Sequence, residues 1–157
     1  MVRGHKGFTL IELMITVALI AILAMAAVPF TASWLHATQV QTAGANLEQA
    51  FAKAKALALR NPAGVTGSDS AASVKLSGST VIVCAGAPGD AGCVVGGGAV
   101  AWQGDVTGGV TIQLAGAALT SIVFDNSGQA IDASGNALAI LDVDIAKGAA
   151  SHDAHLY

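Results

Sequence analysis

Charged residues are scarce in this chain of 157 residues: Asp, Glu, Lys and Arg make up 11%, whereas hydrophobic residues make up 54%. This balance is unusual for a soluble domain. Basic residues are the scarcer charge, with seven Lys and Arg against ten Asp and Glu and a net charge of −3. Because an acidic chain has no general attraction for nucleic acid, the composition disfavours proteins that bind DNA or RNA through overall positive charge.

Cysteine is also scarce, since the chain contains only Cys84 and Cys93. Their spacing is not that of a Cys-x-x-Cys motif, so a zinc site or a thioredoxin-type redox motif has little support. The segment between them contains Pro88, Gly89 and Gly92, which allow a short loop to turn back. A disulfide that closes a loop of about ten residues is expected to contribute roughly 2.5 kcal/mol by the chain-entropy model, and two reduced thiols are the alternative.

Catalytic patterns are absent as well. The sequence shows no nucleophile beside a plausible base, no phosphate-binding glycine loop and no pair of catalytic carboxylates. It also lacks an internal repeat long enough to predict a solenoid. We therefore expect neither an enzyme nor a bound cofactor.

What the sequence does contain is a long apolar run near its start. No charged residue occurs from Leu13 to Leu35, which is about 23 positions or roughly 34 Å of helix, enough to cross a bilayer core. Glu12 lies just before this run. An acidic side chain within a spanning helix costs on the order of 2.5 to 3.5 kcal/mol, so Glu12 is expected to need a partner.

The first seven residues are polar and contain no apolar region of their own. In an ordinary secretory signal the apolar stretch precedes the cut, whereas here it would follow any cut after Gly7. Cleavage between Gly7 and Phe8 would create an amine one helical turn before Glu12. The same amine on a neighbouring copy could neutralise the Glu12 carboxylate when the helices pack.

Topology follows from the charges of this leader. Arg3, His5 and Lys6 precede the apolar run, and the positive-inside tendency then places the N-terminus in the cytoplasm and the rest of the chain outside. Loss of the leader would leave five basic against ten acidic residues, a net charge near −5. An outward, oxidising location agrees with the expected disulfide.

A single long helix is predicted from Phe8 to about Arg60, bent or loosened at Pro29. Its second half is amphipathic and ends at Asn61-Pro62. The apolar or small positions that recur there at steps of four and three are Val40, Gly44, Leu47, Phe51, Ala54 and Ala58. In the first half, the small residues that would allow close helix contact are Ala18, Ala21, Ala24 and Ala27, although a plain lipid-facing surface is the alternative.

After residue 63 the pattern changes to short β-prone runs between turn residues. The expected strands are Val74 to Leu76, Thr80 to Cys84, Ala99 to Trp102, Val110 to Leu114, Leu119 to Phe124 and Ala137 to Val143. The fold class is therefore α+β: a long N-terminal helix packed on an antiparallel, β-rich head. We expect four parts: a leader (1–7), a transmembrane helix (8–35), an amphipathic half-helix (36–62) and the head (63–157).

The run Gly7-Phe8-Thr9-Leu10-Ile11-Glu12-Leu13 resembles the start of type IV pilins and of the pseudopilins of type II secretion. The resemblance implies that a prepilin peptidase cuts after Gly7 and that Phe8 becomes N-methylated. It also implies that Glu12 helps to register the subunit in a filament, and Pro29 falls where many pilins carry a helix-loosening proline. The motif covers about a fifth of the chain, and a simple signal anchor with a chance Glu is the alternative.

The head resembles minor pilins and pseudopilins of the GspH and FimT/FimU type. The features are Val81-Ile82-Val83-Cys84, a second Cys after a short loop, Trp102, and Ile122-Val123-Phe124-Asp125 before a turn. Major pilins usually place their disulfide nearer the C-terminus, which favours a minor subunit. Some FimT-like proteins bind DNA through a basic C-terminal Gly-Arg-x-Arg segment, but the tail from Lys147 to Asp153 has only one Lys for phosphate contacts.

Two metal sites were possible alternatives. Calcium could use the alternating oxygen-bearing side chains Asp125, Ser127, Asp132, Ser134 and Asn136, but no bidentate Glu completes an EF-hand and hairpin turns explain these residues better.

The second alternative lies in the tail. His152 and His155 beside Asp153 could hold a metal in a helical tail, although we expect a disordered tail and no metal. Asp142 and Asp144 are expected to share the solvated face of a strand.

The sequence thus predicts a minor pilin-like structural subunit, single-pass in the bacterial inner membrane with its head in the periplasm. Its filament would be the pseudopilus of type II secretion or a type IV pilus. The expected partners are other pilins, through the N-terminal helix, the prepilin peptidase and the inner-membrane assembly platform. A FimT-like DNA receptor for natural transformation is the alternative.

Overall fold

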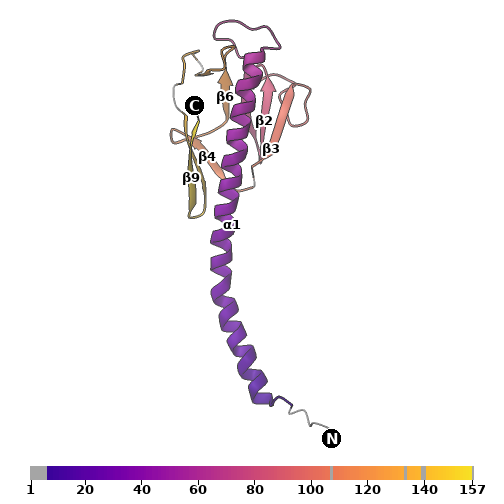
Figure 1. Cartoon of the computed structure of the whole chain (residues 1–157), viewed down its shortest axis with the longest axis vertical. Helices are drawn as coiled ribbons and strands as arrows, with labels where there is room; N and C mark the ends of the chain where they lie inside the picture. Colours follow the sequence, from indigo (N-terminus) through magenta and orange to yellow (C-terminus); the bar gives the residue numbers. More distant parts are fainter. Residues whose placement is uncertain (1–6, 107, 133, 139–140, 157) are drawn as a thin grey trace. The chain divides into compact units, whose positions relative to one another are not determined.

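The computed structural model describes residues 7–106, 108–132, 134–138 and 141–156, without the side chains of residues 28–30. It contains one helix, α1 (Leu10–Arg60), and nine strands in the described ranges (Figure 1). The chain divides into two compact units, of which the first ends at Leu35 and the second begins at His36. The α+β class predicted from the sequence is confirmed.

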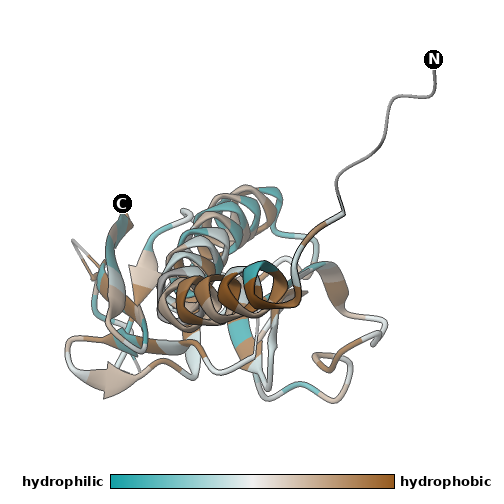
Figure 2. Ribbon diagram, turned by 90° about the horizontal axis from the view of Figure 1, so that it is seen from below, coloured by the Kyte–Doolittle hydropathy of each residue, from teal (hydrophilic) through white to brown (hydrophobic). Residues whose placement is uncertain are grey.

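The first unit consists of the apolar part of α1. The helix begins one turn after Gly7, and Thr9 caps it by accepting a hydrogen bond on Oγ1 from the backbone N–H of Glu12 at 3.3 Å. Its large apolar side chains are exposed, with Met25 at 83%, and Phe8, just before the helix, is exposed to the same extent. Figure 2 shows this stretch of helix almost entirely in the colour of hydrophobic residues. The backbone of α1 continues through Pro29, whose side chain lies outside the described set, so the bend remains a prediction.

The second unit is built around the other half of α1. All six positions predicted to form its apolar face are buried, and Ala43 and Ala50 extend that face. Phe51 packs edge-to-face on Phe124 of the sheet, with ring centroids 4.9 Å apart. The predicted end of the helix is confirmed, because Asn61 adopts a left-handed conformation (φ 44°) and its side chain hydrogen bonds both the N–H and the C=O of Val65.

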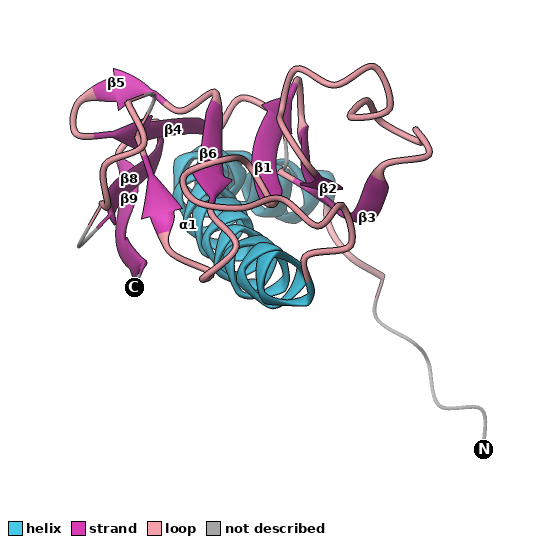
Figure 3. Ribbon diagram, turned by 90° about the horizontal axis from the view of Figure 1, so that it is seen from above, coloured by secondary structure: helices cyan, strands magenta, loops and turns pink. Residues whose placement is uncertain are grey.

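Two antiparallel sheets complete the second unit (Figure 3). The five-stranded sheet has the order β3-β2-β1-β6-β7, and the four-stranded sheet has the order β5-β4-β8-β9. The strands are β1 (Ala72–Ser77), β2 (Thr80–Ala85), β3 (Val100–Asp105), β4 (Thr111–Leu114), β5 (Ala117–Ala118), β6 (Ser121–Phe124), β7 (Ala130–Ile131), β8 (Leu141–Lys147) and β9 (Ala150–Leu156).

The expectation of a disordered C-terminal tail was wrong. Residues 150–156 form β9, which pairs with β8 along its whole length from Lys147↔Ala150 to Leu141↔Leu156. The tight turn between the strands is possible because Gly148 has a positive φ of 59°. Burial of Ala154 and Leu156 in the core adds the apolar contact that holds the tail in place.

Two expected strands also differ from the structure. The strand predicted from Leu119 to Phe124 begins only at Ser121, and Leu119 lies between β5 and β6. The predicted strand from Ala137 begins only at Leu141, and Ala137 instead makes an isolated bridge to Ile131. Residues 139–140 of that prediction lie outside the described residues.

The disulfide between Cys84 and Cys93 is present, with Cα atoms 5.6 Å apart. Both cysteines are fully buried in a second small core with Ile82, against which Val100 packs. This core lies on the face of the five-stranded sheet that α1 does not cover, because the alternate residues Val81 and Val83 face the main core. The disulfide loop therefore covers the back of the sheet.

Candidate functional site

The junction between Gly7 and Phe8 is exposed and non-helical. Both residues precede the first residue of α1, so the peptide bond between them is outside the helical hydrogen-bond ladder. A Cβ added at Gly7 would meet no atom within 4 Å. This chain's own packing thus does not require glycine at that position, and a requirement for glycine would have to come from a protein that binds the junction.

Glu12 occupies the first turn of α1, where a carboxylate interacts favourably with the helix dipole. Thr9 and Glu12 have the Ser/Thr-x-x-Glu spacing of a capping box, and the bond from the Glu12 N–H to Thr9 Oγ1 is half of that motif. The sequence analysis did not predict this cap, although the spacing of Thr9 and Glu12 indicates it. Within the described part of the chain, no cation lies at salt-bridge distance from the Glu12 carboxylate.

A shallow apolar groove follows Glu12 directly along α1. It has a volume of about 340 Å³ and is lined by Leu13, Met14, Val17, Ala18 and Ala21. The two alanines are among the small residues that the sequence suggested for close helix contact. Grooves of this kind accept the side-chain ridges of a second helix.

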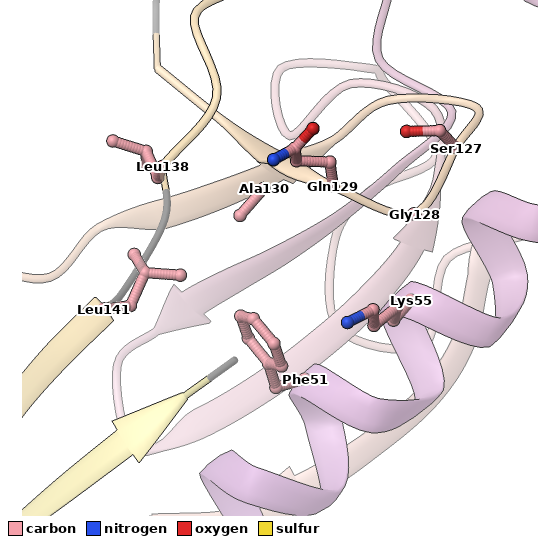
Figure 4. A pocket seen from close by; sticks show the side chains of 8 residues that line it. All are labelled: Phe51, Lys55, Ser127, Gly128, Gln129, Ala130, Leu138 and Leu141. Atoms are coloured by element: carbon pink, nitrogen blue, oxygen red, sulfur yellow. The ribbon is translucent and has the colours of Figure 1, made fainter.

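A pocket of about 380 Å³ lies in the head between α1 and the turn after β6 (Figure 4). Phe51 and Lys55 come from the helix, and Figure 4 shows Gln129 across the space from Lys55. The other lining residues are Ser127, Gly128, Ala130, Leu138 and Leu141. These eight residues include no carboxylate, histidine or cysteine.

The turns after β6 and β7 contain the residues considered for calcium. Asp125 Oδ1 accepts hydrogen bonds from the N–H and hydroxyl of Ser127 and from the N–H of Gln129, all at 2.7 to 2.9 Å. Asp132 accepts the corresponding bonds from Ser134 and Asn136 at 2.8 Å. Each carboxylate thus organises its own turn, the role expected from the turn chemistry.

These hydrogen bonds also set the ionisation of the two carboxylates. Desolvation by burial acts to raise the pKa of Asp125, but the bonds from Ser127, Gln129 and Gly128 together outweigh it, and the pKa lies below its usual value. The bonds from Asn136 lower the pKa of Asp132. No group of three or more His, Cys, Asp or Glu among the described residues is arranged to hold a metal.

The β8–β9 hairpin separates the two histidines of the tail. His155 pairs across the strands with Asp142, with Nδ1 and Oδ1 2.6 Å apart, and both side chains are exposed. His152 lies opposite Ile145 on the other face of the hairpin, next to Gly44 of α1. Because residues three apart on a strand point to opposite faces, the metal arrangement considered for a helical tail does not form.

Asp142 and Asp144 share the exposed face of β8, as predicted. Asp144 lies directly opposite Asp153 of β9. Like charges in this position destabilise a strand pair. This part of the surface is therefore acidic.

Comparison with protein families gave one match: residues 2–28 fit the family described as the prokaryotic N-terminal methylation motif. Neither the curated proteins nor the solved structures gave a significant match. The motif, the apolar helix and the β-rich head together support a type IV pilin-like protein. The motif indicates a structural filament subunit and not an enzyme, and it is consistent with membrane anchoring of the one described helix that is long and apolar enough to span a bilayer.

Proposed function

We propose that this chain is a minor pilin-like structural subunit of an inner-membrane-anchored type IV filament. The filament is either a type II secretion pseudopilus with a GspH-like subunit or a type IV pilus with a FimU-like subunit. One observation carries the proposal: an exposed Gly7–Phe8 junction precedes a helix that has Glu12 in its first turn and apolar side chains exposed all round. The methylation motif spans the same residues.

The exposed apolar surface of the first unit fits two environments in succession: lipid before assembly and the packed helices of a filament after it. A contiguous apolar surface of this size is unstable in water and requires lipid or protein around it. Lipid satisfies the apolar side chains before assembly, but it does not satisfy Glu12. A neighbouring helix in a filament can cover the apolar side chains and also neutralise Glu12, because it brings apolar side chains and the amine of a processed Phe8.

The proposed topology puts the leader in the cytoplasm and the head in the periplasm. Arg3 and Lys6 precede the apolar run, which favours a cytoplasmic N-terminus. A disulfide in the head agrees with an oxidising compartment. In this proposal residues 1–7 are the leader, 8–35 span the membrane and later the filament core, and 36–157 face outward.

The minor-subunit assignment rests on the place of the disulfide within the head. Cys84 is in β2 and Cys93 lies in the loop between β2 and β3, far in sequence from the C-terminal strand. This is the arrangement in which the head resembles GspH and FimT/FimU proteins. Secretion and pilus systems use the same helix and the same peptidase. The genes beside this one would therefore distinguish between the two systems.

The proposal is tested by expressing the full chain with a prepilin peptidase. We expect mass spectrometry to find an N-methylated Phe8 at the start of the mature chain. Gly7→Val should block this processing, whereas Glu12→Ala should leave it intact and lower incorporation into filaments. Glu12→Asp serves as the matched control for the carboxylate. Retention of Met1 in assembled filaments, or normal incorporation of Glu12→Ala, would refute the proposed role.

A further inference from the structure

A hollow of about 290 Å³ lies between the C-terminal half of α1 and β3, and we call it the Trp102 hollow. Figure 3 shows β3 as the outermost strand on its side of the second unit. The residues that line the hollow are Lys53, Ala56, Leu57 and Arg60 of α1 and Ala101 and Trp102 of β3. Neither membrane anchoring nor docking through Glu12 uses these residues.

A β-bulge in β3 turns Trp102 toward α1. Trp102 pairs with Val83 and Val100 pairs with Cys84, so Ala101 between them has no partner on β2. Without this extra residue, Trp102 would lie on the same face as Val100, which packs against the disulfide core. With the bulge, Trp102 packs against the main core that α1 covers. The backbone irregularity thus brings an aromatic ring to the flank of the helix.

The indole ring of Trp102 has a prepared place on this flank. A Cβ at Gly104 would overlap the ring, so glycine there leaves the space that the indole occupies. The Lys53 ammonium lies over the ring, 5.9 Å from its centre, which is within the range of a cation–π contact. Trp102 is nevertheless only half-buried. A positioned and partly exposed tryptophan is a typical anchor residue of protein interfaces.

The two cations of the Trp102 hollow have no carboxylate partner within the chain. All ten Asp and Glu lie in the described ranges, and within those ranges none is at salt-bridge distance from Lys53 or Arg60. Lys75 and Lys147, in contrast, donate hydrogen bonds to backbone carbonyls of the head. Two cations without a carboxylate therefore share one hollow of an acidic chain. A ligand with two carboxylates complements them.

The spacing of the two cations selects the shape of the partner. Lys53 and Arg60 are seven residues apart on α1, so they lie on the same flank and about 10 Å apart along its axis. Two carboxylates seven residues apart on a second helix have the same separation, with room for an apolar side chain midway. In an extended strand, residues about 10 Å apart are three positions apart and point to opposite faces. The geometry therefore favours a helix.

A second copy of this chain does not provide such a helix. α1 contains only Glu12 and Glu48 as acidic residues, and neither has another carboxylate seven positions away. A nucleic acid is a poorer fit, because two cations on a chain with a net charge of −3 offer few phosphate contacts. The partner that this chemistry selects is a helix of a different protein.

We propose that the Trp102 hollow docks a helix of a non-identical subunit of the same filament. Two carboxylates of that helix face Lys53 and Arg60, and an apolar side chain between them packs on Trp102 and Leu57. This inference rests on the proposed filament role, in which the other subunits also contribute long helices. It adds the class of partner that the head recognises.

A designed helical peptide tests the hollow directly. The probe is an alanine-based peptide of about 18 residues, long enough to form a helix in water, with two Glu seven positions apart and one Leu midway. It is titrated against the full chain in detergent, with Trp34→Phe leaving Trp102 as the reporter and empty micelles as the blank. We expect a saturable change in Trp102 fluorescence, and about three- to ten-fold weaker binding when Gln replaces both Glu. No saturable change, or equal binding of the two peptides, would overturn the proposal.

Variants of the chain identify the groups that bind the peptide. Lys53→Gln with Arg60→Gln should weaken binding about three- to ten-fold, the effect of two exposed ion pairs, whereas Lys53→Arg with Arg60→Lys should retain it. Lys55→Gln is the matched control for Lys53→Gln, because residues two apart on a helix point to nearly opposite sides and Lys55 lines another pocket. Equal effects of these two single changes, or no effect of the double change, would contradict the assignment. An unchanged urea midpoint shows that each variant folds.

The identity of the partner is tested in membranes that contain the other filament subunits. A photoreactive side chain replaces Ala101, which is exposed in the hollow, and the matched control carries the same group at Ala117, which is exposed in the other sheet. We expect an adduct only at residue 101, with a different filament subunit, on a helical peptide that has two carboxylates seven residues apart. Lys53→Gln with Arg60→Gln should lower its yield. An adduct with a second copy of this chain or with nucleic acid would overturn the choice of partner.

The two assays separate this inference from the proposed function, because peptide binding in detergent does not require a filament. If filaments form in a Glu12-dependent manner but the chain does not bind the peptide, the docking proposal is wrong and the filament role stands. If the chain binds the peptide through Lys53 and Arg60 but never enters a filament, the helix-binding hollow stands and the filament role is wrong.

Discussion

Replacing both cysteines by alanine should destabilise the head by about 2.5 kcal/mol. Cys84 and Cys93 are nine positions apart, and closing a loop of that length removes entropy from the unfolded chain worth about 2.5 kcal/mol. The loop is not held by the disulfide alone, because Lys75 Nζ donates to the carbonyl oxygens of Pro88 at 2.9 Å and Cys93 at 3.2 Å. These bonds should keep the loop in place after the disulfide is removed, so the fold should persist.

Comparing alanine with serine in place of the two cysteines separates the entropic effect of the disulfide from the effect of side-chain packing. Both sulfur-bearing side chains are fully buried against Ile82, where alanine leaves a small apolar gap. Serine in the same positions would bury two hydroxyl groups, at an additional cost of about 1 to 3 kcal/mol for each that lacks a partner. We therefore expect the serine pair to be clearly less stable than the alanine pair.

Urea unfolding of the full chain in detergent measures these differences. Trp102 in β3 reports on the sheet by fluorescence, with Trp34→Phe removing the other tryptophan. A loss of about 2.5 kcal/mol should lower the urea midpoint by roughly 1 to 2 M, and reduction of the wild type should lower it similarly. A shift below about 0.3 M on confirmed reduction would refute the loop-closure argument, because the folded contacts are otherwise the same.

Three further predictions concern the head. Gly128→Ala should destabilise it by at least about 1 kcal/mol, since φ is 77° and the new Cβ would lie 3.1 Å from Leu59. Gly44→Ala should change stability little, because its one close contact, at 2.9 Å, is with the movable ring of His152, and Ile145 lies at an ordinary contact distance of 3.5 Å. The lowered pKa of Asp125 means that its contribution is present above the unfolded value of 3.8 and is lost as pH falls through the folded value. Acid titration of Asp125→Asn should therefore show a shallower loss of stability below about pH 4 than the wild type. Finally, the full chain should not shift duplex DNA in a gel at moderate salt; tight, salt-sensitive binding would favour the receptor alternative.

The helix was predictable from the sequence because its signals are local. The buried face from Val40 to Ala58 repeats at steps of three and four, and Asn61-Pro62 ends the helix by backbone chemistry alone. The first strands were also predictable, since β1 and β2 are joined by a tight turn at Gly78. In these segments each residue is explained by neighbours within a few positions.

The tail was not predictable in the same way, because its order depends on distant residues. The sequence from Ala150 to Leu156 has weak β propensity and alternates poorly, with three exposed residues in a row. It becomes a strand because β8 provides a partner and because Ala154 and Leu156 complete a core that α1 also forms. Its polar pattern predicts disorder, because the sequence alone does not show the tertiary contacts that overcome this pattern.

The same distinction between local and long-range signals applies to the candidate site. Glu12 stands out in the sequence by its chemistry, and the structure adds the Thr9 cap and the apolar groove that begins beside it. The Trp102 hollow could not be predicted, because it forms only where α1 and β3 lie side by side, and these segments are far apart in sequence.

Under the proposed function, the energies at Glu12 would favour assembly over the isolated chain. Its place in the first turn is worth about 0.3 to 1 kcal/mol through the helix dipole. Lipid around the same carboxylate costs about 2.5 to 3.5 kcal/mol, so the helix dipole offsets only part of the cost. A neighbouring Phe8 amine can supply the remainder, but only after cleavage at Gly7 has created it. In the proposed filament, the same residue would therefore disfavour docking of an unprocessed chain and favour docking of a processed one.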